Sequence, residues 1–439
     1  MLDVISRVHD RLDPARNLLH GISSGQARAR VGTGDPASVD AIDGSFAIVA
    51  CDPPFVRMAR TIDRPMRYFL AKAEDGPELV VSDRIDDIAD WLRSRGMADQ
   101  FHPSYTRMVP AHHILTLHLV GCPDPEPTLQ RFFTPERASL PSDLDEIGRR
   151  YIGALSGEIE RLLRAIPEHE PIGVPFSGGV DSGSVLLLLY ERTLALGLNP
   201  ARLKAFTLHM AGGTDLDQAR AFLEALDLSL FLEPIEASPG ELDPDDVLRT
   251  VEDYKVLDVE SAAMNLALLR GIRKRYPEWR YLVDGDGGDE NLKDYPIEEN
   301  TELTIRSVLN NLLLYQEGWG VGSIKHSVTY SGGQSRACTR GYAPASLTSF
   351  ALFSPYTRRA VIDVAESIPF IELTDWNVER LYHLKGEIVR RGVAELTGFD
   401  MPVFPKRRFQ HGALDPDRLS DVFPRSESEL RRRFHELYA

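Results

Sequence analysis

Cysteine is scarce in this sequence. Its 439 residues include three cysteines, Cys51, Cys122 and Cys338, which lie far apart. Such spacing excludes a CxxC metal centre and a disulfide framework, and it suits a reducing cytosol. We therefore expect a cytoplasmic protein.

Long hydrophobic runs are absent as well. The longest aliphatic run, Val185–Leu189, is far shorter than the roughly 20 residues that cross a bilayer. The first residues, MLDVISRVHDRLD, lack the apolar segment of a secretory signal. We expect a soluble protein with no membrane partner.

Positive charge is the third feature in short supply, because the formal net charge is −16. Proteins that bind tRNA or DNA duplexes normally present a basic surface. The densest basic run, Arg431–Arg433, lies among Glu427, Glu429 and Glu436, as on a solvated helix face. We expect small-molecule substrates and no nucleic-acid partner.

The length and the 43% hydrophobic content are typical of a globular protein with more than one domain. The N-terminal third favours strands separated by turns, with one helix at Ile85–Arg95. The expected strands, the first entered through a turn, are Asp40–Val49, Tyr68–Ala73, Leu79–Ser82 and His112–Val120. Five prolines between Cys122 and Asp143 indicate a linker. The expected domains are therefore residues 1–140 and 141–439.

The second domain begins with a helical pattern at Leu144–Ala165 and then alternates strands with helices. The expected strands are Ile172–Phe176, Leu203–His209, Ser229–Leu232 and Arg280–Asp284, and the expected helices are Ser184–Gly197, Asp215–Leu226 and Ala262–Tyr276. Such alternation is typical of a parallel sheet with helices on both faces. From Glu302 the pattern is mostly helical, with an irregular Gly-rich stretch at Gly318–Gly341. The fold class is therefore α/β: a strand-rich domain, then a parallel α/β domain with a helical extension.

The string SGGVDS, Ser177–Ser182, follows one of these strands and opens a helix. Glycines at such a junction let backbone N–H groups approach an anion, and the helix N-terminus adds its positive dipole. Asp181 would repel a phosphate unless a cation lay between them, so it predicts Mg²⁺. The similar string SGGQS at Ser331–Ser335 has no acid and no aliphatic helix after it. We interpret it as a flexible loop that could act as a lid.

A second acidic turn occurs in YLVDGDGGDENLKDY, Tyr281–Tyr295. It could be an exposed turn, and its spacing excludes an EF-hand calcium loop. The carboxyl ends of parallel strands meet at one edge of a sheet, where ligands bind. Asp181 and Asp289 could then hold one Mg²⁺ across a pyrophosphate.

These strings resemble those of a known enzyme group. SGGVDS is similar to the pyrophosphate loop of the ATP-pyrophosphatase (PP-loop) family, and DGDGGDE to the SGEGxDE turn of asparagine synthetases. Three further stretches, Thr250–Val256, Lys385–Arg391 and Pro405–Gly412, resemble other segments of that family in the same order. The chain from Ile172 to Gly412 thus resembles the asparagine synthetase/β-lactam synthetase superfamily.

The resemblance implies a role for individual residues. Ser177, Gly178, Gly179 and Ser182 would grip the phosphates of ATP; Asp181 and Asp289 would hold Mg²⁺; Phe176, Leu208, Asp284 and Gly285 would surround adenine and ribose; Lys385 would lie near pyrophosphate and Lys406 near the reacting centre. Asp286 stands where asparagine synthetases have a glutamate and β-lactam synthetases a tyrosine.

The implied chemistry is amide synthesis. A carboxylate attacks the α-phosphorus of ATP, pyrophosphate leaves, and an amine attacks the acyl-adenylate. Mg²⁺ and lysines would neutralise the developing charge. A protonated amine cannot attack, so Asp286 is our candidate base. Both lysines also have a plain surface interpretation.

The N-terminal third departs from the family pattern. Glutamine-dependent members carry an N-terminal nucleophilic cysteine, whereas this chain begins Met1-Leu2-Asp3. DGSFAIVACD, Asp43–Asp52, resembles the family's DGxFAxxxxD, but much of the usual preceding sequence is missing. We expect a truncated, inactive glutaminase-like domain of the Ntn-hydrolase type. The nitrogen would come from an amine on the acid itself, a second amine, or ammonia, free or from a partner.

Alternatives stay open at this point. A tRNA-adenylating or tRNA-thiolating PP-loop enzyme would need a basic face and catalytic cysteines. A pseudoenzyme would have no physical need for both acids and the lysine. Glu260, Asn265 and Lys255 are candidates for acyl-substrate contacts, with an equally plain surface interpretation. The resemblance also implies a homodimer.

Overall fold

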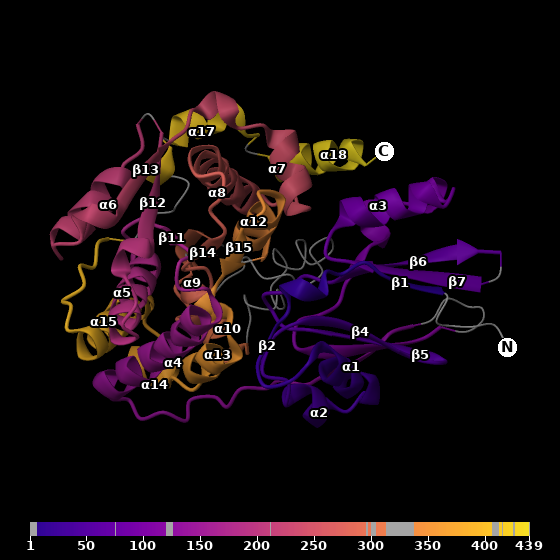
Figure 1. Cartoon of the computed structure of the whole chain (residues 1–439), viewed down its shortest axis with the longest axis horizontal. Coiled ribbons are helices and arrows are strands. Elements are labelled where there is room, and N and C mark those ends of the chain that lie inside the picture. The colour runs from indigo at the N-terminus through magenta and orange to yellow at the C-terminus, as the bar shows by residue number, and fades with distance from the viewer. Residues whose placement is uncertain are drawn as a thin grey trace. The chain divides into compact units, whose positions relative to one another are not determined.

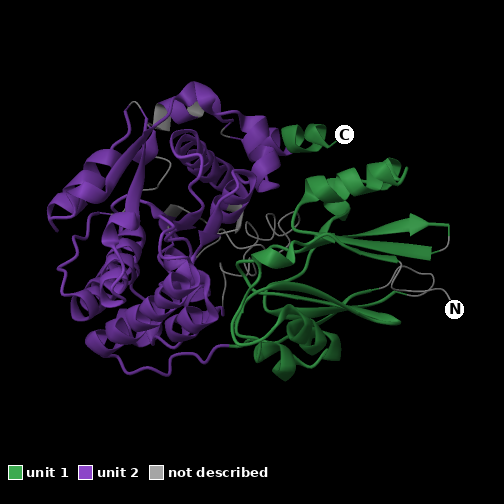
Figure 2. Ribbon diagram, in the orientation of Figure 1, with its two compact units in different colours: residues 1–134, 314–338, 432–439 green, residues 135–313, 339–431 purple. Residues whose placement is uncertain are grey.

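The computed structural model describes residues 7–74, 76–119, 126–210, 212–295, 297–299, 304–312, 338–405, 412–414, 416–424 and 426–438. The chain divides into two compact units (Figure 2). Unit 1 comprises residues 1–134, 314–338 and 432–439, and unit 2 comprises residues 135–313 and 339–431. None of the helices in the described ranges combines the length and the apolar character that crossing a bilayer requires.

Unit 1 contains two four-stranded sheets. One has the order β1 (Val8–Asp10), β7 (Gly76–Ser82), β6 (Arg67–Ala73), β8 (Arg107–Met108), and the other β10 (Thr128–Arg131), β9 (His113–His118), β5 (Phe55–Arg60), β4 (Ala47–Asp52). A short pair, β2 (Leu18–Leu19) and β3 (Gly44–Ser45), accompanies them.

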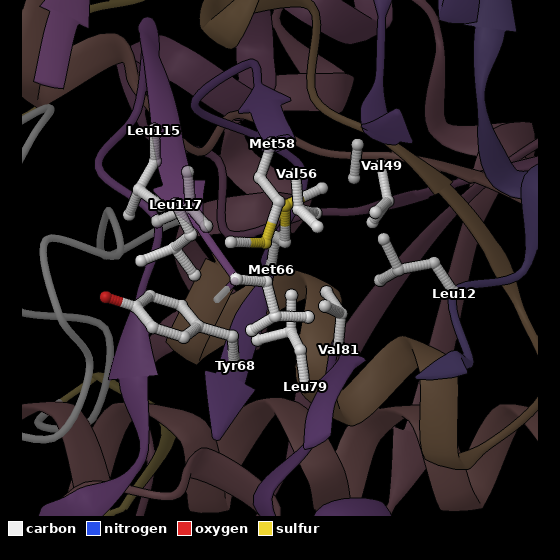
Figure 3. Close-up of a cluster of buried hydrophobic side chains, with 13 residues drawn as sticks. Leu12, Val49, Val56, Met58, Met66, Tyr68, Leu79, Val81, Leu115 and Leu117 are labelled. Carbon is white, nitrogen blue, oxygen red and sulfur yellow. The ribbon is translucent and has the colours of Figure 1, made fainter. Parts of the chain in front are cut away.

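One apolar core joins side chains from both sheets (Figure 3). Val49, Met58 and Leu115 come from one sheet, and Tyr68 and Val81 from the other. Side chains alternate along a strand. The neighbours Phe69 and Val80 accordingly pack against helix α3 (Ile85–Ser94) together with Ile88, Trp91 and Leu92.

The expectation of a single helix in this region was wrong. The structure adds α1 (Ser24–Thr33) and α2 (Pro36–Asp40). Helix α1 has almost no apolar periodicity, because Ala27 and Val31 are its only buried residues. The sequence pattern therefore does not predict it. Its ends are instead set by a capping box between Ser23 and Gln26 and by Gly34 in the left-handed conformation.

Unit 2 is built on five parallel strands. Their order is β13 (Leu232–Glu236), β12 (Leu203–His209), β11 (Ile172–Pro175), β14 (Tyr281–Val283), β15 (Ala351–Phe353). The strand-rich N-terminal region and this parallel sheet with helices confirm the α/β fold class. Two strands of this sheet differ most from expectation: β13 begins where the expected strand ends, and β15 was not anticipated. Helix α8 (Val256–Arg275) begins six residues before the expected Ala262.

The order in which strands are added to the sheet reverses between β11 and β14. From β11 the chain moves outward to β12 and β13, then returns to add β14 and β15 on the other side of β11 (Figure 1). At such a reversal the loops after the two central strands diverge and leave room for a ligand beyond the strand ends. The two Gly/Asp turns follow these two strands.

The connecting helices frame this edge. Helix α5 (Val180–Ala195) follows β11, α6 (Asp215–Glu224) follows β12, and α7 (Pro244–Val251) and α8 (Val256–Arg275) lead from β13 to β14. Apart from α4 (Leu144–Ala165) and α15 (Val378–Thr397), the other α-helices of the described residues after the linker are α9 (Gly288–Asn291), α10 (Ile305–Asn310), α12 (Ala343–Leu347), α13 (Arg359–Glu366), α14 (Phe370–Thr374), α17 (Pro416–Val422) and α18 (Glu427–Leu437).

Helices α4 and α15 cross at two glycines. A Cβ on Gly392 would lie 2.2 Å from the carbonyl oxygen of Gly148, and a Cβ on Gly148 would lie 2.8 Å from that of Ile388. Only glycines allow this approach. The crossing fixes the position of α15, which carries Lys385.

Candidate active site

The turn after β11 is held by its own serines. Ser182 Oγ accepts a hydrogen bond from the backbone N–H of Ser177 (3.3 Å), and Ser177 Oγ accepts one from that of Gly179 (3.3 Å). Gly178 has φ +70°, and a Cβ there would lie 2.9 Å from a backbone oxygen of α6. Gly179 caps α5 without a side-chain hydrogen bond to the first turn. The N-terminal N–H groups of this 16-residue helix are thus presented to an anion.

The turn after β14 packs directly onto the first turn. A Cβ on Gly285 would lie 2.9 Å from the backbone nitrogen of Ser182, and one on Gly288 would lie 2.2 Å from Asp181 Oδ1. Gly287 has φ +101°, a conformation that favours glycine. The glycines of DGDGGDE therefore bring the second turn against Asp181.

Lys385 lies between the acids of the two turns. Its Nζ donates to Asp181 Oδ2 (2.6 Å) and to Asp289 Oδ1, and Asp294 Oδ2 lies 3.6 Å away. Burial alone would lower the pKa of Lys385, but the charges of the three carboxylates outweigh it and raise that pKa well above its ordinary value. Asp181 and Asp289 thus meet at one ammonium group.

Asp284 and Asp286 form a second acidic pair. The backbone N–H of Asp286 donates to Asp284 Oδ1 (3.3 Å). Burial raises the pKa of Asp284 to about 6. Burial and the neighbouring Asp284 charge raise the pKa of Asp286 well above its ordinary value. A carboxylate with a raised pKa is a stronger base than an ordinary one once it is ionised.

Buried polar side chains form a hydrogen-bonded layer behind the two turns. Ser184 of α5 and Tyr356 share a hydrogen bond between their hydroxyl groups (2.6 Å). Asn291 of α9 donates to the carbonyl oxygen of Tyr356 (2.9 Å) and to the hydroxyl of Tyr151 on α4 (3.3 Å). Burial raises the pKa of Tyr356 far above its ordinary value, so this hydroxyl stays neutral. The layer ties α4, α5 and α9 together.

The other candidate residues from the sequence lie in different surroundings, and some lie outside the described residues. Phe176 is buried and packs edge-to-face on Phe222, and Leu208 is buried in β12. Asn265 donates to the carbonyl oxygen of Arg340 (2.7 Å). Lys406 and the Ser331–Ser335 loop lie outside the described residues.

Sequence reasoning missed Asp294, Tyr356 and Arg340. Asp294 follows the acid-rich turn in the same string, so a wider window on that string would have included it. Arg340 lies at the end of the irregular Gly-rich stretch, where no periodic pattern distinguishes it. Tyr356 carries no local signal, because only the tertiary fold brings it beneath α5.

The donor set fits Mg²⁺ that arrives with ATP. In the described part of the chain, no three carboxylate, imidazole or thiol groups gather as ligands of one ion. Asp181 and Asp289 nevertheless present carboxylate oxygens to one cation, the Lys385 ammonium group. Mg²⁺ is commonly held by one or two carboxylates, with substrate phosphates and water as its remaining ligands.

One family model covers the part of the chain that carries both turns. The family model for asparagine synthase matches residues 161–395, somewhat more than half of the chain. A comparison with curated protein sequences gave no match. Among solved structures, NMN synthetase from Francisella tularensis aligns over 57% of this chain and 96% of its own, with 12% identity and a TM-score of 0.24, a similarity too weak to indicate a common function.

Proposed function

Because this chain belongs to the asparagine synthase family, whose members are ATP-dependent amide-forming ligases, we propose that it adenylates a carboxylate and couples it to an amine without using glutamine. The products would be an amide, AMP and pyrophosphate. The amine would be part of the acid itself, giving a lactam, or belong to a second molecule, in secondary metabolism.

The convergence of two acidic turns at Lys385 is the main support for this proposal. Asp181 lies in the first turn of α5, and Asp289 lies in α9. The uncapped end of α5 and the Ser177–Ser182 turn suit the phosphates of ATP. By resemblance to the family, Phe176, Leu208, Asp284 and Gly285 would surround the adenine and ribose.

Asp181 and Asp289 would hold Mg²⁺ on the leaving pyrophosphate. The ion would neutralise charge that develops as the bond to the α-phosphorus breaks. Lys385 would contribute its ammonium group to the same phosphates, since its raised pKa keeps it charged. By the same resemblance, Lys406 would stabilise the charge on the reacting acyl group.

The nitrogen source is the second half of the proposed reaction, and Cys51 bears on it. Desolvation and the charge of Asp10 raise the pKa of the Cys51 thiol, although the residue is exposed, and a raised pKa disfavours the reactive thiolate. This supports an inactive glutaminase-like region. The alternative is amidation by ammonia, free or supplied by a partner, as in asparagine synthetases.

The test is acid-dependent exchange of radiolabelled pyrophosphate into ATP, with pools of amino and carboxylic acids as substrates. Adenylation predicts exchange with some pool, and Asp181→Asn should lower it at least about a hundredfold, because a metal ligand at the phosphates is lost. Asp217→Asn, on the exposed surface of α6, is the matched control and should keep the exchange.

Analysis of the products tests whether AMP is formed and which amine is used. Formation of ADP and phosphate would contradict the proposal. Loss of water from the acid would identify cyclisation, and gain of the mass of ammonia less water would identify amidation. We also propose a cytoplasmic homodimer, and light scattering on the purified chain tests the dimer.

A further inference from the structure

Tyr356 is a completely buried residue that contacts both Gly/Asp turns. It lies in the short 3₁₀-helix Pro355–Thr357, between strand β15 and helix α13. The residue is 0% exposed, and burying a hydroxyl group without a hydrogen-bond partner is costly. The partners of this residue therefore show what its position is for.

The side chain of Tyr356 reaches the backbone of Asp181 through one serine. The Ser184 hydroxyl lies 2.6 Å from the Tyr356 hydroxyl and 2.9 Å from the carbonyl oxygen of Asp181. A carbonyl oxygen can only accept, so Ser184 donates to Asp181, and the Tyr356 hydroxyl donates to Ser184 Oγ. These two hydrogen bonds form a chain that holds the backbone of Asp181.

The backbone of Tyr356 holds the second turn. Its carbonyl oxygen accepts a hydrogen bond from Asn291 Nδ2 (2.9 Å), two residues after Asp289 in α9. A Cβ on Gly287 would lie 3.2 Å from the Cβ of Tyr356, so the second turn packs closely on this residue. One residue thus fixes the backbone on both sides of the gap that Lys385 spans between the two carboxylates.

We propose that Tyr356 is a positioning residue that sets the separation of Asp181 and Asp289, and with it the divalent ion that they accept. This inference rests on the proposed function and adds a preference for Mg²⁺ over the larger Ca²⁺. Mg²⁺ requires near-octahedral ligands at about 2.0–2.1 Å, whereas Ca²⁺ tolerates irregular ligands at about 2.3–2.6 Å. Carboxylates held at a short, fixed separation favour the smaller ion, and carboxylates that can move apart favour it less.

Two substitutions break the hydrogen-bond chain without removing a charge. Tyr356→Phe removes one hydroxyl group and keeps the ring that stacks on Tyr151, with 6.0 Å between the ring centroids. Ser184→Ala breaks the chain at its middle link. Neither side chain would itself contact the ion, so both act through the position of Asp181.

The experiment is thermal unfolding of the full chain with saturating α,β-methylene-ATP, whose α–β bond does not break, titrated with Mg²⁺ or with Ca²⁺. The rise in Tm gives an apparent Kd for each ion. For Tyr356→Phe we expect the Kd of Mg²⁺ to rise about tenfold and that of Ca²⁺ about twofold or less. Ser184→Ala should give the same change, and the double variant no further change, because one chain is broken in all three.

Tyr190→Phe is the matched control. It removes a hydroxyl group from the same helix, α5, where the Tyr190 ring contacts Phe231 and Phe399. Both constants should stay at their wild-type values in this variant. A merely structural role for Tyr356 would lower the Tm without ligands and leave the ratio of the two constants unchanged, and that result would overturn the inference. If Tyr356→Phe does not fold, Ser184→Ala alone decides.

The wild-type protein separates this inference from the proposed function. Stabilisation by Mg²⁺ with the nucleotide analogue, together with an unchanged ratio in Tyr356→Phe and Ser184→Ala, would leave the proposed function standing and remove the inference. Absence of any effect of Mg²⁺ and the analogue on the wild type would remove the proposed function, and the inference with it.

Discussion

At the scale of single residues, Lys385 is the buried cation that three carboxylates of the site share. Three carboxylates from two segments of the sequence surround its ammonium group, and the side chain is almost completely buried. Removing one partner of a buried ionic group leaves the others without compensation. We therefore expect Lys385 to contribute to stability as well as to the proposed phosphate site.

Lys385→Met should show both contributions. We expect the free energy of unfolding to fall by about 2–4 kcal/mol without metal, because Asp181, Asp289 and Asp294 then repel one another. Millimolar Mg²⁺ should restore part of the loss, because the ion neutralises the same carboxylates. Urea unfolding with and without Mg²⁺ measures the effect. Lys274→Met, on the exposed face of α8, is the control, and an equal loss in both variants would contradict the argument.

Asp253 gives the protein a specific pH dependence. Its carboxylate is buried and accepts hydrogen bonds from the backbone N–H groups of Tyr254 (2.7 Å) and Lys255 (3.4 Å). Burial and the charge of Asp258 raise the pKa of Asp253 to about 7. The folded chain thus holds this proton more tightly than the unfolded chain does.

Between about pH 4 and pH 7, Asp253 is ionised in the unfolded chain but still protonated in the folded chain. Its contribution to the free energy of unfolding therefore falls as pH rises through this range and is constant above pH 7. Asp253→Asn keeps the acceptor oxygen and has no such proton. Its stability relative to wild type should rise by up to about 1 kcal/mol per pH unit across that window. Urea unfolding at several pH values checks this, and parallel curves for the two proteins would refute it.

At the scale of elements, the crossing of α4 and α15 should show opposite effects of the same substitution. Gly392→Ala would place a methyl group against the backbone of Gly148 and should destabilise by about 1–3 kcal/mol. Gly153→Ala on α4 meets no atom within 4 Å and should stabilise by about 0.5–1 kcal/mol through helix propensity. Urea unfolding of both variants tests the crossing, and loss of stability in Gly153→Ala would contradict it.

Elements with strong periodicity could be predicted from the sequence, and short ones could not. Helix α4 and strand β12 match their expected bounds, because each carries a sustained apolar pattern. Strand β15 has three residues and no pattern of its own, since its pairing with β14 defines it. Helix α5 begins at Val180 rather than Ser184, because the Asp-Ser-Gly-Ser string resembles a loop.

The parts of the candidate site that could be predicted are those in which neighbouring residues form a recognisable motif. Each Gly/Asp turn could be recognised as a string that follows a strand. The pairing of β14 with β11, which brings the two turns together, does not follow from the order of the strands along the chain. The bridging position of Lys385 depends on where α15 crosses α4. The backbone of residue 341 approaches both Asp284 and Asp286, and a Cβ there would lie 2.8 Å or less from each carboxylate. These are tertiary facts without a local pattern in the sequence.

At the scale of the whole molecule, the two compact units should unfold as separate transitions. Each unit has its own sheets and apolar side chains, and chains of this size commonly depart from two-state behaviour. A ligand that binds one unit raises the melting temperature of that unit. Calorimetry with Mg²⁺ and α,β-methylene-ATP should therefore raise one transition only. A single transition that shifts as a whole would refute this expectation.

The reversal of strand order at β11 and β14 has a consequence for how the chain can be divided. More than a hundred residues separate Ser177 from Asp289 along the chain, yet the turns that carry them pack together. A break between β13 and α7 would leave half of the proposed phosphate site on each fragment. Neither fragment would work alone, and activity would report directly on their reassembly, as in a split enzyme.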